Sequence, residues 1–424
     1  MNDIRMLKNN TMNIARFLFL SLFTALAFTS CTDKTNQLTN GVWRGALQTD
    51  NSVDIPFNFE IYDSLGVKQM AFLNGKERLN INEIEETADS VFIKTPLYES
   101  EIRAVKTANG LQGKWIKHLP NKTISMPFMA ESNQSFRFVK EENSGVINMT
   151  GRWSVQFYKN NGTDTTFAVG EFEQSGNQVN GSFLTTTGDY RFLSGVVDNK
   201  TFMVSAFSGS SPVLFTGDLT DGSDIIKGKM YAGPSSVMNW SARRDEDAML
   251  PDAYKIAGLK PGNDRITFSF QDLDGNKVSL SDDRFKDKVV VVQFLGSWCP
   301  NCMDETAFLA PFYEKYKNKG LEIIGLAYER YKEMDKAKAA VLNLKNRFKV
   351  NYPILLTGYT NDKGQVEESI PALDNFSAFP TTIIIKKDGT VDKIHTGFSG
   401  PATGKHYTEF TQEFEKEINK LLAE

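Results

Sequence analysis

Cysteine and histidine are both scarce in this sequence. Only three residues of each type occur among 424. A small disulfide-stabilised domain spreads many cysteines over its loops, and a structural zinc site needs four ligands, usually two cysteine pairs or one pair with added histidines. Here only Cys299 and Cys302 lie close together, and the histidines are scattered along the chain. The sequence therefore argues against a disulfide scaffold and predicts no metal site.

An excess of charge of one sign and a long apolar segment are also missing. Acidic residues outnumber basic ones by only 52 to 48, so the net charge of -4 gives no indication of a nucleic-acid partner. The apolar run at residues 17–28 would span about 18 Å as a helix, against about 30 Å for a bilayer core. Because basic residues precede this run and small residues follow it, we interpret residues 1–30 as a secretory signal.

Thr29 and Ser30 end the signal and Cys31 follows it, a cut site that resembles the lipoprotein box of bacteria. In such a box the cysteine is lipidated and becomes the first residue of the mature protein, so Cys31 is a candidate lipidation site. Phe28 departs from the usual leucine, and an unlipidated cysteine after a soluble-secretion signal is the alternative. Residues 31–40 are polar and would form a tether. An exported protein would lie in a compartment where disulfides persist.

The next two hundred residues predict an all-β region. Short segments of alternating apolar residues recur between turn sequences, without long helical patterns. GVWRGAL near the start recurs 110 residues later as GRWSVQF, and GLQGKW recurs as IIKGKM. We therefore expect two related antiparallel β units, at 41–145 and 146–246. Their role is open between a spacer, a recruiting surface and a dimerisation surface. The tryptophans interpreted as core residues are Trp43, Trp115, Trp153 and Trp240.

A charged, proline-containing segment at 247–259 is interpreted as a linker to a C-terminal domain at 260–424. This domain alternates strand and helix patterns, which favours an α/β fold with a central mixed sheet flanked by helices. The expected strands are 288–296, 321–329 and 352–356 with a hairpin at 381–397, and the expected helices are 300–317, 332–348 and 407–421.

The two close cysteines lie where the first of these strands is followed by a helix. Free N–H groups at a helix start stabilise negative charge, so Cys299 is favoured as the thiolate. Cys302 lies one turn further and is expected to be less exposed and to keep its proton longer. Cys299 would attack a substrate disulfide, and Cys302 would then attack the mixed disulfide and release the reduced product. A structural disulfide and a metal-carrier role are alternatives, whereas haem attachment would need histidine where Met303 stands.

A resemblance to a known family rests on WCPNC at 298–302, FPTT at 379–382 and the KDG turn that follows. These motifs resemble the thioredoxin superfamily, and most closely its TlpA-like and ResA-like thiol–disulfide oxidoreductases. The resemblance covers residues 258–424 and implies a thioredoxin-like fold for that part of the chain.

The resemblance also implies roles for single residues. Pro380 matches the cis-proline that lies beside the cysteines and keeps metal ions away from them. Phe379 would offer its backbone to a substrate strand, and Trp298 would cover the site. Together with Pro300, between the cysteines, these residues are candidates for positioning the substrate.

Two carboxylates are further candidates. Glu305 matches the acidic residue of the family pattern WCxxCxxE and could accept or relay the proton of Cys302, although a solvated glutamate in the first helical turn is the alternative. Ala307 stands where the family has proline, which bears on helix geometry and not on the chemistry. Glu329, at the end of the second strand, is a weaker candidate.

Three hypotheses for function follow. The first is a lipid-anchored enzyme that faces the periplasm from either bacterial membrane and reduces disulfides of exported proteins, with apocytochromes c suggested by the resemblance. It would hold no cofactor besides the redox-active Cys299–Cys302 disulfide, and a membrane electron donor would re-reduce it. The second is a disulfide oxidase or isomerase, which the uncharged Pro-Asn between the cysteines disfavours. The third is a cell-surface binding module with an accessory redox domain.

Overall fold

The computed structural model describes residues 38–424 except 142–144, 146, 160–161, 163–164 and 222–223. The described residues belong to one compact unit. The expected signal, Cys31 and most of the tether lie outside them. Among the helices of the described part, none is both long and apolar enough to cross a membrane.

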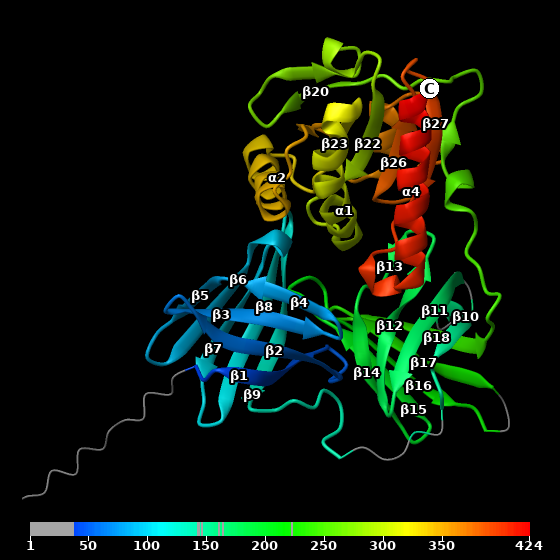
Figure 1. The fold of residues 1–424 in the computed structure, drawn as a ribbon. Helices are drawn as coiled ribbons and strands as arrows, with labels where there is room; N and C mark the ends of the chain where they lie inside the picture. The colour runs from blue at the N-terminus through cyan, green and yellow to red at the C-terminus, as the bar shows by residue number, and fades with distance from the viewer. Residues whose placement is uncertain (1–37, 142–144, 146, 160–161, 163–164, 222–223) are drawn as a thin grey trace, which may run out of the picture. The chain divides into compact units, whose positions relative to one another are not determined.

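The first nine strands form one antiparallel sheet (Figure 1). Its strands are β1 Gly41–Gln48, β2 Asp54–Ser64, β3 Val67–Asn74, β4 Glu77–Ile81, β5 Glu83–Glu86, β6 Ser90–Thr95, β7 Ser100–Lys106, β8 Gly110–Leu119 and β9 Lys122–Ser132, with the 3-10 helix η1 Pro96–Tyr98 after β6. Their order is β4-β3-β2-β1-β9-β8-β7-β6-β5. Apolar side chains from alternating positions of these strands form a single core.

The next nine strands form a second antiparallel sheet. Its strands are β10 Gly151–Tyr158, β11 Thr166–Ser175, β12 Gln178–Thr185, β13 Gly188–Asp189, β14 Leu193–Asp198, β15 Thr201–Ala206, β16 Val213–Leu219, β17 Ile225–Ala232 and β18 Ser236–Arg244. Their order is β11-β10-β18-β17-β16-β15-β14-β12-β13, and a further pairing of β11 with β12 closes the sheet on itself.

The two sheets share several local features. In each, the first strand lies between the second and the last, as β2-β1-β9 and β11-β10-β18. A Cβ added at Gly113 in β8 or at Gly228 in β17 would lie about 2 Å from a carbonyl oxygen of the neighbouring strand, so both positions exclude a side chain. Trp43 and Trp153 each donate their indole N–H to the carbonyl four residues earlier, at 2.9 Å. The similar segments seen in the sequence thus occupy equivalent strands.

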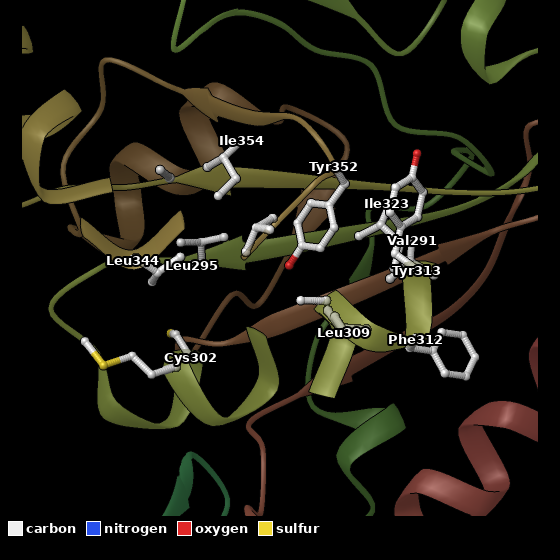
Figure 2. Close-up of a cluster of buried hydrophobic side chains, with 14 of the residues drawn as sticks. Val291, Leu295, Cys302, Leu309, Phe312, Tyr313, Ile323, Leu344, Tyr352 and Ile354 are labelled. Atoms are coloured by element: carbon white, nitrogen blue, oxygen red, sulfur yellow. The ribbon is translucent and has the colours of Figure 1, made fainter. Parts of the chain in front are cut away.

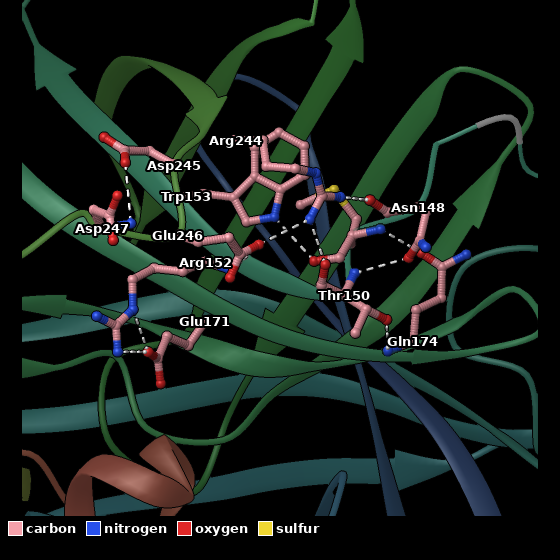
Figure 3. Close-up of polar contacts among 11 residues, drawn as sticks. Asn148, Thr150, Arg152, Trp153, Glu171, Gln174, Arg244, Asp245, Glu246 and Asp247 are labelled. Atoms are coloured by element: carbon pink, nitrogen blue, oxygen red, sulfur yellow. Dashed lines mark hydrogen bonds and ion pairs between the residues drawn. The ribbon is translucent and has the colours of Figure 1, made fainter.

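Polar contacts on the second sheet surround the tryptophan of its first strand (Figure 3). The Arg244 guanidinium stacks over the Trp153 ring, 4.6 Å from its centroid. The Arg152 guanidinium pairs with Glu171 at 2.7 Å. All four tryptophans of the β region are at most 4% exposed, which confirms their interpretation as core residues.

The remaining residues form a seven-stranded mixed sheet with helices. Its order is β21-β20-β24-β23-β22-β26-β27, in which β22, β23 and β24 are parallel. The elements are η2 Ala253–Lys255, β19 Gly258–Leu259, β20 Ser269–Asp272, β21 Lys277–Ser279, η3 Asp283–Phe285, β22 Val289–Leu295, α1 Pro300–Tyr316, η4 Lys317–Lys319, β23 Leu321–Ala327, α2 Met334–Phe348, β24 Ile354–Leu356, α3 Lys363–Ser369, β25 Leu373–Asp374, β26 Thr381–Ile385, β27 Val391–Thr396, η5 Pro401–Thr403 and α4 Lys405–Ala423.

The strand β22 is buried on both faces, as its valine run predicts. Val289, Val291 and Leu295 face the core shared with α1, α2 and α4, whereas Val290 and Val292 face a second core on the other side of the sheet. Figure 2 shows Cys302 among the side chains of the first core. The sulfur pair is therefore held between a rigid strand and a packed helix.

The predicted elements of this domain are present. The strands, the hairpin and the three long helices match the expected segments, and α1 continues through Pro311 as one helix. Sequence reasoning missed α3 and the short strands at the sheet edge. Gly258 and Leu259, which the sequence places in the linker, pair with β25 and so extend the contacts of the C-terminal domain.

Candidate functional site

The two cysteines lie at the junction of β22 and α1. Cys299 is the N-cap of α1, with Pro300 at the first helical position, where proline is favoured because its missing N–H would have no partner. The backbone N–H of Cys302 donates to the Cys299 sulfur at 3.3 Å. Both cysteines are free thiols. The helix start therefore supplies a donor to a negative charge on the first sulfur, as the sequence predicts.

The second thiol is held in its protonated form. Cys302 is fully buried, whereas Cys299 is 6% exposed. Burial raises the pKa of Cys302 well above the ordinary thiol value, and the neighbouring Cys299 sulfur raises it further. The expected division between an attacking and a protonated thiol thus has a structural basis.

The Phe379–Pro380 peptide bond is cis and lies beside the first cysteine. The Cys299 sulfur lies 3.6 Å from the Phe379 carbonyl oxygen. Trp298 packs edge-on against the Phe379 ring and donates its indole N–H to the Tyr328 carbonyl at 3.0 Å. Of the four residues that the sequence proposes for positioning, the structure brings Trp298, Phe379 and Pro380 together, and Pro300 follows Cys299 at the start of α1.

Glu305 lies beneath the cysteines in a buried polar cluster. It is 2% exposed, accepts a hydrogen bond from Thr382 at 2.6 Å and accepts another from Gln293 at 2.8 Å. Burial raises the pKa of Glu305 to about 7, against both hydrogen bonds. The negative charge of ionised Glu305 raises the pKa of Cys302. Among the described residues, no direct hydrogen bond joins the two side chains. The solvated alternative for Glu305 is therefore wrong, and its proton is exchangeable near neutral pH.

Glu329 is also buried and fixes the turn before the cysteines. Its two oxygens accept hydrogen bonds from the N–H of Ser297 at 2.8 Å and from the Ser297 hydroxyl at 2.7 Å. Burial raises the pKa of Glu329 to about 7. Since Ser297 follows β22 and Glu329 follows the parallel strand β23, this contact ties two strand ends together.

Sequence reasoning missed a buried charge cluster at the same turn. Arg191 of the second β unit donates to the Pro300 carbonyl at 3.1 Å, between the two cysteines. Its guanidinium also pairs with Asp304 at 2.7 Å and with Glu77 at 2.6 Å. Burial raises the pKa of Asp304 to about 7, although the Arg191 charge opposes this. Nothing in the local pattern around Arg191 marks it as buried, because the contact joins residues more than 100 positions apart.

Comparisons with known proteins agree with this geometry. The Redoxin family model matches residues 260–408. The thiol-disulfide oxidoreductase ResA of Bacillus thuringiensis is 35% identical over 133 residues, which cover 31% of this chain and 68% of that protein. The chain belongs to the TlpA/ResA-like family of thiol–disulfide oxidoreductases.

Two further comparisons cover a similar share of this chain. The ResA protein of Bacillus subtilis is 30% identical over 139 residues, covering 33% of this chain and 69% of that protein. A solved structure of a thioredoxin family protein from Chlorobium tepidum TLS covers 39% of this chain and 99% of its own length at 18% identity, with a TM-score of 0.30. The residues matched by the Redoxin model, 260–408, lie in the C-terminal part of this TlpA/ResA-like enzyme, and the β region lies outside them.

Proposed function

We propose that the chain reduces disulfides of exported proteins from a lipid-anchored position on the periplasmic side of a bacterial membrane. Cys299 attacks one sulfur of the substrate disulfide, forms the mixed disulfide and releases the other substrate sulfur as a thiolate. Cys302 then gives up its proton, attacks the Cys299 sulfur and releases the second substrate thiol. Two electrons pass from the dithiol to the substrate, and the enzyme is left with the Cys299–Cys302 disulfide.

The observation that carries this proposal is the contrast between the two thiols. One sulfur accepts a helix N-terminal N–H, and the other is fully buried with a raised pKa. Glu305 is proposed to accept the proton of Cys302, since its own pKa lies near 7. Trp298, Pro300, Phe379 and Pro380 are proposed to position the substrate sulfur.

The direction of reaction is tested by the reduction potential of the cysteine pair, measured by equilibration of the full chain with defined thiol buffers. We expect a value near about -270 mV, as for thioredoxin, because Pro-Asn places no positive charge between the cysteines. A value near about -120 mV would instead make the protein an oxidase.

The substrate class is tested with the Cys302→Ser variant, which cannot release a mixed disulfide. Expressed with its own signal sequence, it should accumulate covalent complexes with exported proteins, apocytochromes c among them. The Cys299→Ser variant is the matched control and should trap none. Re-reduction by a membrane donor is tested by following the redox state of the wild type after the membrane electron supply is inhibited.

We also propose an anchor and a domain division. Cys31→Ser should move the protein from the membrane fraction to the soluble fraction and abolish fatty-acid labelling. The proposed divisions are a signal at 1–30, a tether at 31–40, β units at 41–145 and 146–246, a linker at 247–259 and the redox domain at 260–424. The equivalent Gly113 and Gly228 support duplication of the β units.

A further inference from the structure

A cavity of about 350 Å³ opens beside the first cysteine. Trp298, Cys299 and Pro300 line it on one side. Most of the remaining lining comes from the β region and includes Lys117, Tyr190, Arg191, Phe207, Ser208 and Ser211. Cys299 is 6% exposed and lines this cavity, so a substrate disulfide would reach its sulfur from there.

Two cations that line this cavity, Lys117 and Arg330, form no ion pair with a described carboxylate. Lys117 is 6% exposed, and within the described residues neither Lys117 nor Arg330 forms an ion pair within 4.0 Å. The Arg330 guanidinium stacks over the Trp298 ring, 4.5 Å from its centroid. A buried ammonium without a partner is costly, which favours binding of an anion.

The other charged groups of the lining are already satisfied. Arg191 is paired with Glu77 and Asp304, and the Asp189 carboxylate accepts backbone N–H groups. Outside the lining, Glu99 attracts both free cations, but it is hydrogen-bonded by Tyr331 and burial raises its pKa. The free charge that the cavity offers to a ligand is therefore positive.

A second cavity adjoins the first. Its volume is about 440 Å³, and it shares Lys117, Ser211 and Arg330 with the cavity at Cys299. Beyond these three residues it follows the turn between β8 and β9, at residues 119–124. The two cations thus lie where the cavity at the reactive sulfur adjoins the second cavity. An extended peptide fits this arrangement better than a single small anion.

We propose that this space is a subsite for an acidic peptide segment, in which an Asp or Glu next to the substrate cysteine binds Lys117 and Arg330. The inference rests on the proposed reductase function and adds a substrate preference to it. A carboxylate held there would align the neighbouring disulfide with the Cys299 sulfur. Opposite charge would also speed the encounter at low salt.

The test uses synthetic peptides with one internal disulfide and identical sequences except at the position beside one cysteine, which is Glu, Gln or Lys. The reduced full-length protein is mixed with each peptide, and thiols are quenched with acid and counted by mass spectrometry. We expect the Glu peptide to be reduced about tenfold faster than the Gln peptide, the effect of one charge-assisted hydrogen bond. Dithiodipropionate, a small disulfide with two carboxylates, should gain no such advantage over an uncharged analogue.

Three variants locate the effect. Lys117→Met keeps the buried volume and should reduce the preference for Glu to within about twofold, whereas Lys117→Arg should retain it. Lys114→Gln removes an exposed cation of the same strand that lines neither cavity, and it should leave the preference unchanged. Reduction of the Gln peptide by all three variants verifies that they are folded and active.

The outcomes separate the two proposals. Equal rates for all three peptides, or a preference that Lys114→Gln removes as effectively as Lys117→Met, overturn the subsite and leave the reductase function intact. A preference confined to dithiodipropionate overturns the peptide as occupant. If no disulfide is reduced faster by the wild type than by Cys299→Ser, the proposed function itself fails.

Discussion

Replacement of Glu305 by glutamine should change the free energy of unfolding in opposite directions at low and high pH. Burial raises the pKa of Glu305 from 4.5 to about 7 in the folded protein. The unfolded chain therefore releases this proton at lower pH than the folded chain. Stability contributed by the protonated carboxyl is complete below pH 4.5 and is lost as the pH rises through about 7.

The magnitude follows from the difference between the two pKa values. At about 1.4 kcal/mol for each tenfold change in proton affinity, ionisation of buried Glu305 lowers the free energy of unfolding by roughly 3 kcal/mol at pH 8. Glutamine carries no such penalty, but its amide has only one oxygen to accept from Thr382 and Gln293, so one hydrogen bond worth about 1 kcal/mol is lost. At pH 5 about 0.8 kcal/mol of this stability is already lost, so we expect Glu305→Gln to be only slightly less stable than wild type at pH 5 and about 2 kcal/mol more stable at pH 8.

The assay is urea unfolding of the reduced full chain at pH 5 and pH 8, followed by tryptophan fluorescence and near-ultraviolet circular dichroism. Glu368→Gln, on an exposed position of α3, is the matched control and should shift neither midpoint. A Glu305→Gln effect of the same size and sign at both pH values would refute the reasoning, because it would mean that Glu305 is already ionised at pH 5.

Three further predictions concern the same region and the β units. Glu305→Gln should slow the second, releasing step of reduction about tenfold while leaving formation of the mixed disulfide unchanged, as measured by rapid quenching; an equal slowing of both steps would mean general misfolding. Arg191→Gln should lower the free energy of unfolding by about 3–5 kcal/mol at pH 8, because two buried carboxylates lose their partner, and by less at pH 5, where Asp304 is protonated. Gly228→Ala should cost more than about 2 kcal/mol in urea unfolding, since its methyl group meets a neighbouring backbone, whereas Gly258→Ala, which meets nothing within 4 Å, should be neutral.

The sequence was sufficient for the sulfur site because its signals are local. A valine run predicts a strand buried on both faces, and the cysteine spacing places one sulfur at the start of the next helix and the other one turn later. The structure has both features, with Cys299 as the N-cap of α1. Glu305 was found from its match to the family pattern, but its burial was not predicted, because it depends on Gln293 and Thr382 from two different strands.

The charged groups around the cysteines could not be predicted in the same way. Lys117 lies in a strand where alternation places a lysine on a solvent face as readily as on a buried one. Arg191 precedes a strand and has a positive φ of 58°. An arginine in the sequence does not indicate this backbone conformation. Each is buried by contacts with residues far away in the sequence. Tertiary packing buries these two side chains, and the local pattern of a single sequence does not show that packing.

These contacts change the view of the β region as a mere spacer. The two residues between the cysteines both contact the second β unit, since Pro300 accepts a hydrogen bond from Arg191 and the Asn301 amide lies so close to Gly188 that a Cβ there would meet it. A partner of the cysteine turn that is itself buried restrains the geometry in which the disulfide forms and breaks. We therefore expect Asn301→Ala to shift the reduction potential of the full chain, whereas the exposed change Lys114→Gln should not. If the reduction potential is unchanged in both variants, the β region does not influence the cysteine pair through Asn301, and its role is limited to lining the cavity at Cys299.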